Sequence, residues 1–319
     1  MNTHAYAFVL QLVEAVLAVA LAPLLAGWVA QCRAWLQSRS APPLLQPYRT
    51  LRKLFRKDAA LATHASPVFR GAPYVVFGTM ALSAAIIPSI TTTLPLARVA
   101  DAIALVGLFA TARVSISLAA MDIGTPFGTL GARREMMIGF LAEPALLMVL
   151  FNAFLLFGAT ALPTVVEGTL GAHGFALHPS LAFAGVAFVM VLLAENARIP
   201  IDNPATHLEL TMIHEAMLLE YSARHLALME WASWLKLFNY ICIGFALFAP
   251  WGVAVQGSEP LPLLLALAAL VAKLAVAGAV LAVIETVSAK LRIFRAPEFL
   301  STAFLLAVLG LLVHLLLGT

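Results

Sequence analysis

Long apolar stretches alternate with short polar segments along most of the sequence. A helix that crosses about 30 Å of hydrocarbon needs about 20 apolar residues, and these stretches reach or approach that length. The pattern predicts an all-α polytopic membrane protein with about eight transmembrane helices, in a single membrane domain that covers residues 1–319. The predicted spans are roughly 6–30, 72–94, 99–121, 137–160, 179–196, 233–255, 261–285 and 297–317.

The composition supports lipid as the surrounding solvent. Apolar residues make up 62% of the chain and charged residues 11%, against roughly 45–50% and 25% in soluble domains. The mean hydropathy is +0.96. The first apolar run has no basic segment before it and exceeds the roughly 7–15 residues of a signal-peptide core, so we expect it to remain as the first span.

Basic residues gather on alternate connections between the predicted spans. The connection at 31–71 alone carries eight Lys and Arg residues, whereas the opposite side of the membrane has only Arg98. By the positive-inside rule, the odd-numbered connections are cytoplasmic. Eight spans then place both termini on the periplasmic side.

The first connection contains an amphipathic segment, "QPYRTLRKLFRK" at 46–57, which predicts an interfacial helix at about 46–60. Its apolar residues recur at helical spacing, and basic residues fill the rest of each turn. Two interpretations remain open: a lipid-headgroup anchor, or a helix that docks a partner or lines a cavity. The basic residues are Arg49, Arg52, Lys53, Arg56 and Lys57.

A polar cytoplasmic-side segment at about 196–232 stands out because it and its border collect six carboxylates. A solvated surface helix fits poorly, because apolar residues occupy most of its remaining positions. We expect instead that the segment enters the protein at membrane depth and lines a hydrated cavity, where carboxylates could pass protons. On an unbroken helix, Glu209 and Glu220 would lie within about 20° of each other. The six are Glu195, Asp202, Glu209, Glu215, Glu220 and Glu230.

Ionisable residues also occur inside the predicted spans, where they are costly and usually mark an ion path or a buried pair. A static ion pair, such as Lys273 with Glu285, is the competing interpretation. The others are Glu14, Arg113 and Glu143.

Cofactor motifs are missing from the sequence. His214-Glu215 begins a zinc-protease pattern, but Leu218 stands where HExxH requires histidine. The sequence has no phosphate-binding glycine motif and no cysteine set for an iron–sulfur cluster. We therefore expect no redox cofactor, nucleotide or metal in this chain.

Three stretches resemble a known family: "QPYRTLRKLFRK", "MDIGTPFGTLGARREMMIGFLAEP" at 121–144, and "ENARIPIDNPATHLEL" through "EYSARHLALMEW" at 195–231. The chain resembles the H-type membrane subunit of respiratory complex I, and most of all that of formate hydrogenlyase and group 4 energy-converting [NiFe] hydrogenases. The resemblance implies a bacterial inner-membrane subunit that joins hydrogenase-like large and small subunits and an iron–sulfur subunit to antiporter-like membrane subunits. Iron–sulfur clusters and the NiFe centre would lie in those partner subunits. No nucleic-acid partner is expected.

The resemblance also implies roles for individual residues. Glu195, Arg198, Pro200 and Asp202 match the family's E-x-x-R-x-P-x-D pattern. The predicted proton path contains Glu143, Glu195, Asp202, Glu209, Glu215, Glu220 and Glu230. Residues with a predicted structural or coupling role are Arg133, Arg134, Arg198 and His214.

The sequence departs from the complex I pattern in two places. The stretch between Glu209 and Glu220 is about three residues longer and includes His214 and Glu215, and the first connection lacks the R-x-G-P-N stretch beside the quinone cavity. The leading hypothesis is a membrane-anchoring, ion-coupling subunit of a formate hydrogenlyase-like complex. The alternatives are the corresponding subunit of a quinone-reducing complex I, and a stand-alone secondary transporter, although we find no internal repeat that would favour a transporter. The ion, H⁺ or Na⁺, and the electron donor remain open.

Overall fold

A computed structural model describes residues 3–317 apart from 63, 99–100, 172–178, 203–212, 256–259, 290 and 292–294. The described residues form helices joined by turns and loops, with one isolated bridge between Thr91 and Ala254. The helices are α1 (Thr3–Leu36), α2 (Gln46–Phe55), α3 (Pro67–Ile86), the 3₁₀ turn η1 (Leu96–Arg98), α4 (Ala102–Asp122), α5 (Pro126–Phe157), α6 (Leu162–Gly171), α7 (Pro179–Glu195), α8 (His214–Leu218), α9 (Ala223–Phe248), α10 (Pro260–Val287) and α11 (Ala296–Leu317).

The prediction of an all-α polytopic membrane protein is confirmed. Within the described part of the chain, seven helices are long and apolar enough to cross a membrane, and the fifth predicted span, 179–196, corresponds to the shorter apolar helix α7, of 17 residues. Several predicted boundaries differ from the ends of the helices, and two predicted starts were furthest from the structure. Helix α5 begins at Pro126 rather than 137, and α9 begins at Ala223 rather than 233. Polar residues that the hydropathy pattern assigned to the connections before these helices therefore belong to α5 and α9.

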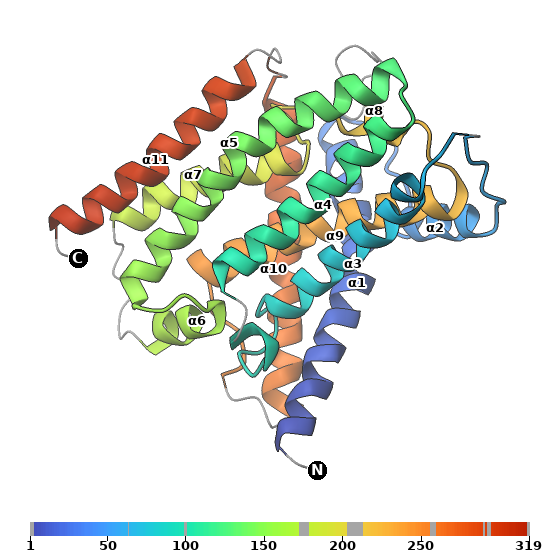
Figure 1. Cartoon of the computed structure of the whole chain (residues 1–319). Helices are drawn as coiled ribbons and strands as arrows, with labels where there is room; N and C mark the ends of the chain where they lie inside the picture. The colour runs from blue at the N-terminus through green and yellow to red at the C-terminus, as the bar shows by residue number, and fades with distance from the viewer. Residues whose placement is uncertain are drawn as a thin grey trace.

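The helices form a bundle in which neighbours along the chain often pack together. Helices α3 and α4 pack on each other, α4 packs on α5, and α5 and α7 pack against α11. Figure 1 shows α4, α5 and α11 running in a similar slanted direction, while α1 and α10 lie side by side and run more steeply. Helix α9 contacts both α1 and α3 and so connects the two parts of the bundle.

Helix α2 has the amphipathic form that its sequence predicts. Pro47 stands in its first turn, and Leu51 and Leu54 are buried against Ala227 of α9. All five basic residues of the predicted interfacial helix are exposed on its other faces or just beyond its end. Each buried leucine contributes about 1.5–3 kcal/mol relative to exposure, so the apolar face determines how α2 lies on the bundle.

Pro23 interrupts the hydrogen-bond ladder of α1 and leaves a carbonyl oxygen available to other elements. A proline has no N–H to donate to the carbonyl four residues earlier, which here is that of Val19. The indole Nε1 of Trp231 on α9 donates to this oxygen at 2.9 Å. The hydroxyl of Tyr48 on α2 donates to the next carbonyl, that of Ala20. The interfacial helix and α9 are thus both attached to the same turn of α1.

Helix α7 ends in a Schellman turn that begins the polar segment. Arg198 N donates to Leu193 O at 2.9 Å, and Ala197 N donates to Ala194 O at 3.2 Å, the two bonds of this motif. Ala197 takes the left-handed conformation, with φ 48°, that glycine usually supplies here. The turn directs Arg198 away from the axis of α7 and toward α10.

The polar segment is not one unbroken helix. Its first part, 203–212, lies outside the described residues, so the predicted alignment of Glu209 with Glu220 is tested only at Glu220. Helix α8 ends at Leu218, and Glu220 lies in the turn before α9 begins. Asp202 Oδ2 accepts a hydrogen bond from Ile213 N at 3.1 Å, so the described residues on either side of 203–212 lie close together.

Candidate functional site

Five ionisable side chains from four helices meet inside the bundle around Arg113. The guanidinium of Arg113, on α4, bonds to the carboxylates of Glu143 on α5 and Glu195 at the end of α7. Its Nε lies 3.5 Å from Glu135 Oε1, also on α5. Lys236 Nζ, on α9, lies 2.9 Å from the second oxygen of Glu195. We name these five residues the Arg113 cluster.

A glycine makes room for Arg113 between α4 and α5. A Cβ atom added at Gly139 would lie 2.3 Å from Arg113 Nη1 and 2.5 Å from its Cδ, well inside contact distance. Arg113 has only 4% of its side-chain surface exposed. The absence of a side chain at position 139 therefore lets the guanidinium cross to α5 and reach its acidic partners.

The Arg113 cluster contains more acids than bases. If all five groups were ionised, three carboxylates would face two cations, and the cluster would carry one net negative charge. Burying an uncompensated charge costs several kcal/mol. Each carboxylate of the cluster contacts a cation, yet the acids outnumber the bases by one. The arrangement therefore contains one carboxylate charge that the two bases do not balance.

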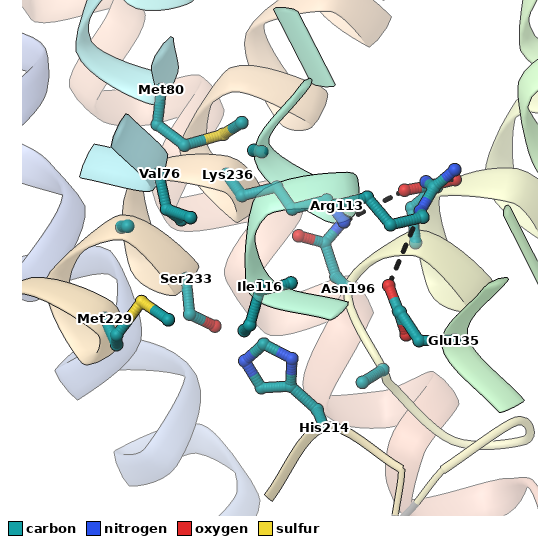
Figure 2. A pocket seen from close by; sticks show the side chains of 14 residues that line it. Val76, Met80, Arg113, Ile116, Glu135, Asn196, His214, Met229, Ser233 and Lys236 are labelled. Carbon is teal, nitrogen blue, oxygen red and sulfur yellow. Dashed lines mark hydrogen bonds and ion pairs between the residues drawn. The ribbon is translucent and has the colours of Figure 1, made fainter. Parts of the chain in front are cut away.

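A small cavity of about 40 Å³ adjoins the Arg113 cluster. A buried water needs roughly 10–15 Å³ of such space and two or more polar partners, so this inner cavity has room for a few waters. Figure 2 shows Arg113, Glu135, Asn196, Lys236 and His214 around it. Its lining residues are Val76, Met80, Ala112, Arg113, Ile116, Glu135, Glu195, Asn196, Ala197, His214, Met229, Ala232, Ser233 and Lys236.

A larger cavity of about 690 Å³ lies beside it, between α1, the start of α2, α8 and α9. This interfacial cavity is lined by apolar residues and by a group of charged or titratable ones. The two cavities share four lining residues, so they adjoin each other at these residues. The charged and titratable lining residues are Arg33, Arg198, Asp202, His214, Glu215, Tyr221 and Glu230, and the four shared residues are Asn196, Ala197, His214 and Ser233.

His214 stands between the two cavities. It begins α8, and in Figure 2 its ring lies below Ile116 and Ser233 and points into the inner cavity. Its Nε2 is enclosed and has no hydrogen-bond partner among the described residues. Burial lowers the pKa of His214, although Glu135 and Asp202 act in the opposite direction. A neutral imidazole with one uncommitted nitrogen is suited to accept and release a proton.

A second buried carboxylate lies near the interfacial cavity. Oε1 of Glu285, on α10, accepts a hydrogen bond from Arg198 Nη1 at 2.9 Å. Its Oε2 lies 3.6 Å from Nη1 of Arg33 on α1. The alternative interpretation, a static pair of Lys273 with Glu285, is wrong, because twelve residues along one helix separate them by about 18 Å. Lys273 instead donates to Ala249 O at 2.7 Å.

The predicted site residues fall into three groups. Glu143 and Glu195 belong to the Arg113 cluster, whereas Asp202, Glu215 and Glu230 line the interfacial cavity. Glu220 is exposed, and Glu209 lies outside the described residues. Of the predicted coupling residues, Arg198 and His214 line the interfacial cavity, Arg133 is exposed, and Arg134 is partly buried near the start of α5.

The sequence analysis named Arg113 only as an ionisable residue inside a span, and it left Glu135 and Lys236 out of the candidate site. Glu135 was placed in a connection, because the polar start of α5 lowers the local hydropathy. Had α5 been extended to Pro126, the helical spacing of three and four residues would have placed Glu135 on the same face as Ile138 and Ala142, and that face is buried. Within the described residues, no group of three or more His, Cys, Asp or Glu side chains is placed to hold a metal ion.

Comparisons with known proteins cover nearly the whole chain. A family model described as NADH dehydrogenase matches residues 8–316. Formate hydrogenlyase subunit 4 of Escherichia coli (strain K12) is 33% identical over 299 residues, which cover 94% of this chain and 96% of that protein. Hydrogenase-4 component C of the same organism is 34% identical over 251 residues, which cover 79% of this chain and 78% of that protein.

A solved structure has the same fold. It is a chain of the membrane-bound sulfane sulfur reductase, an archaeal respiratory membrane complex, with a TM-score of 0.81. The match covers 95% of this chain and 98% of the other, at 20% sequence identity.

Proposed function

The chain belongs to the NADH dehydrogenase family of complex I-like membrane subunits, and we propose that it couples a cytoplasmic redox arm to ion movement through the Arg113 cluster. The family resemblance predicted from the three motifs is thereby confirmed. The relatives are named as a formate hydrogenlyase subunit and a hydrogenase component, so they belong to multi-subunit complexes. The proposed host is a formate hydrogenlyase-like complex in a bacterial inner membrane, with both termini periplasmic.

The observation that carries this proposal is the excess of carboxylates in the Arg113 cluster beside two adjoining cavities. Three acids and two bases in a buried site bind a proton most favourably as a group. His214, Asn196 and Ser233 connect this site to the interfacial cavity, which lies behind α2 on the side that the basic residues assign to the cytoplasm. A proton would enter from that side, pass His214 and be held by the Arg113 cluster.

The interfacial cavity is also the proposed meeting place with the redox arm. Glu215 and Glu230 line it, and the exposed basic residues of α2 lie beside its rim. A redox-linked rearrangement in a partner above this cavity would change the electrostatic environment of His214 and of the acids that line it. The iron–sulfur subunit and the hydrogenase-like large and small subunits are the proposed partners, with antiporter-like membrane subunits on the bundle's flank.

The test uses the whole complex reconstituted in liposomes. Replacing Glu143 by Gln removes one acid from the Arg113 cluster with little change in side-chain shape. With 32% of its side chain exposed, Glu143 is the least buried of the three acids. We expect hydrogen turnover to continue while the ions moved per turnover fall several-fold. Glu298→Gln, an exposed acid in the first turn of α11, is the matched control and should leave both quantities unchanged.

Unchanged ion movement in both Glu143→Gln and Glu195→Gln complexes of normal turnover would reject the carboxylate path. Collapsing the signal with a protonophore, but not with a sodium ionophore, would identify the ion as H⁺.

The interfacial cavity supports a second candidate function, quinone reduction. Its volume of about 690 Å³ falls in the range of about 300–1,000 Å³ of small-molecule sites. Quinone-dependent turnover that quinone-site ligands inhibit would favour this function. The missing R-x-G-P-N stretch in the first connection speaks against it, as does the naming of both relatives as parts of hydrogen-related complexes. The same names count against a stand-alone transporter, which solute uptake by the isolated chain in liposomes would establish.

A further inference from the structure

Glu14 is a buried carboxylate on α1, in the half that precedes Pro23 and away from the interfacial cavity. Only 2% of the residue is exposed. Its Oε1 accepts three hydrogen bonds of 2.6 Å, from Ser89 N, Ser89 Oγ and Ile90 N. These donors belong to the loop after α3. One carboxylate oxygen is therefore saturated by the protein itself.

The other oxygen of Glu14 is different. Oε2 is enclosed, yet no donor among the described residues bonds to it. Leaving a buried acceptor unsatisfied costs about 1–3 kcal/mol, and more when the group is charged. The basic residue of α10 inside the bundle, Lys273, bonds to the Ala249 carbonyl and lies over the Phe245 ring, so it is already engaged. Oε2 is therefore a hydrogen-bond acceptor for which the described residues supply no donor.

Glu14 lines an apolar groove of about 320 Å³ between the first half of α1 and the first half of α10. Glu14 is the only ionisable residue of its lining, which otherwise consists of Leu10, Val13, Leu17, Ile90, Thr91, Pro260, Leu263, Leu264 and Leu267. Figure 1 shows these two helices side by side near the N-terminus.

The groove is open at the outer surface of the bundle. Val13 and Leu264, on its rim, are 49% and 64% exposed. Both lie on helices long and apolar enough to span the membrane. Its volume lies at the lower end of the range of about 300–1,000 Å³ for small-ligand sites, which are typically apolar with a few placed polar groups.

We propose that this groove binds an amphiphilic amine that enters from the bilayer. The ammonium group donates to Glu14 Oε2 and supplies the missing hydrogen bond and the opposite charge. The apolar tail lies along the leucines of α1 and α10. Charge-assisted hydrogen bonds of this kind are roughly twice as strong as neutral ones, so the charge distinguishes an amine from a neutral lipid chain of equal length.

The test measures chemical labelling of Glu14 in the assembled complex in nanodiscs. Dicyclohexylcarbodiimide reacts from the bilayer with protonated carboxyl groups in apolar surroundings, and peptide mass spectrometry reports the labelled fraction at Glu14. We expect N,N-dimethyloctylamine (octylamine below), a tertiary amine that cannot form an amide with the activated carboxyl group, to reduce labelling several-fold, because its ammonium occupies Oε2. Octanol, which has the same tail without the charge, should leave labelling unchanged.

Two tryptophan variants separate the groove from a general surface effect. Leu264→Trp fills the groove and should block both labelling and the octylamine effect while Glu14 is still present. Leu265→Trp is the matched control, because Leu265 is adjacent, equally exposed at 63% and outside the groove lining, and it should behave like the unmodified protein. Glu14→Gln confirms that the labelled peptide reports Glu14.

Three results would overturn the proposal. They are an absence of Glu14 labelling at both acidic and alkaline pH, labelling that octylamine does not reduce, and equal protection by octylamine and octanol. The last would mean that the groove takes up apolar chains without recognising charge.

Discussion

Arg113 on α4 and Glu195 at the end of α7 form a buried ion pair across 82 residues of sequence. Arg113 also bonds to Glu143, and Glu195 also bonds to Lys236. The pair therefore holds α4, α5, α7 and α9 at one point near the middle of the bundle. Because so many helices depend on it, its removal should affect structure and coupling together.

Replacing Arg113 by Met should destabilise the protein by about 3–5 kcal/mol, because three carboxylates lose their shared cation. Thermal unfolding of the purified complex, monitored by the release of this subunit, would measure the change. Arg224→Gln removes an exposed arginine at the start of α9 and should shift stability by less than about 0.5 kcal/mol. Equal effects of the two variants would contradict the buried role of Arg113.

Gly139→Ala should reduce stability by about 1–3 kcal/mol, because the new methyl group would occupy the space of the Arg113 guanidinium. Ion movement per turnover should fall with it. Gly107→Ala, on α4, meets nothing within 4 Å, and alanine favours a helix interior by about 0.5–1 kcal/mol. Thermal midpoints of the two variants should therefore move in opposite directions.

Ala197→Gly should stabilise the turn after α7 by about 1 kcal/mol, because a left-handed conformation costs an L-residue roughly 1–2 kcal/mol. Ala194→Gly, three residues earlier and inside the last turn of α7, should have the opposite sign. It adds backbone freedom and removes a buried methyl. Hydrogen exchange of the Arg198 amide, which donates to Leu193 O in the Schellman turn, would measure both effects.

The pH dependence of stability should contain a contribution from His214. Its pKa is lowered in the folded protein, mainly by burial, so the unfolded chain takes up a proton at a higher pH than the folded one does. Stability should then fall as the pH drops below about 6.5, by up to about 1.4 kcal/mol per pH unit until the folded residue also titrates. His214→Gln should flatten this slope in thermal midpoints measured across the acidic range. An unchanged slope would show that the loss arises from other groups.

The fold was largely predictable, because span length and hydropathy follow from local sequence. The boundaries of α5 and α9 were not, because Gly131, Arg133 and Arg134 at the start of α5 resemble a polar connection. They are helical because α8 packs against this part of α5, where Gly131 lies close to the carbonyl of Ile213. Such a contact between distant segments leaves no local pattern.

The site was predictable only in its acidic members. Glu143 and Glu195 followed from family motifs, whereas Glu135 was hidden by the misplaced start of α5. Lys273 and Glu285 were paired because both are ionisable residues in one span, yet the partners of Glu285 come from α1 and the turn after α7. Which charges meet depends on how the helices cross, and periodicity within one helix does not contain that information.

The break at Pro23 has a mechanical consequence. Two neighbouring carbonyls of α1, one turn before the proline, are held by Tyr48 of the surface helix and Trp231 of α9, and Trp231 stands about 7.5 Å along the same helix from Lys236. A force applied to the surface helix by a docked subunit would act on α1 and α9 at a common anchor. This anchor thus links the exposed face of α2 to the helix whose Lys236 bonds to Glu195.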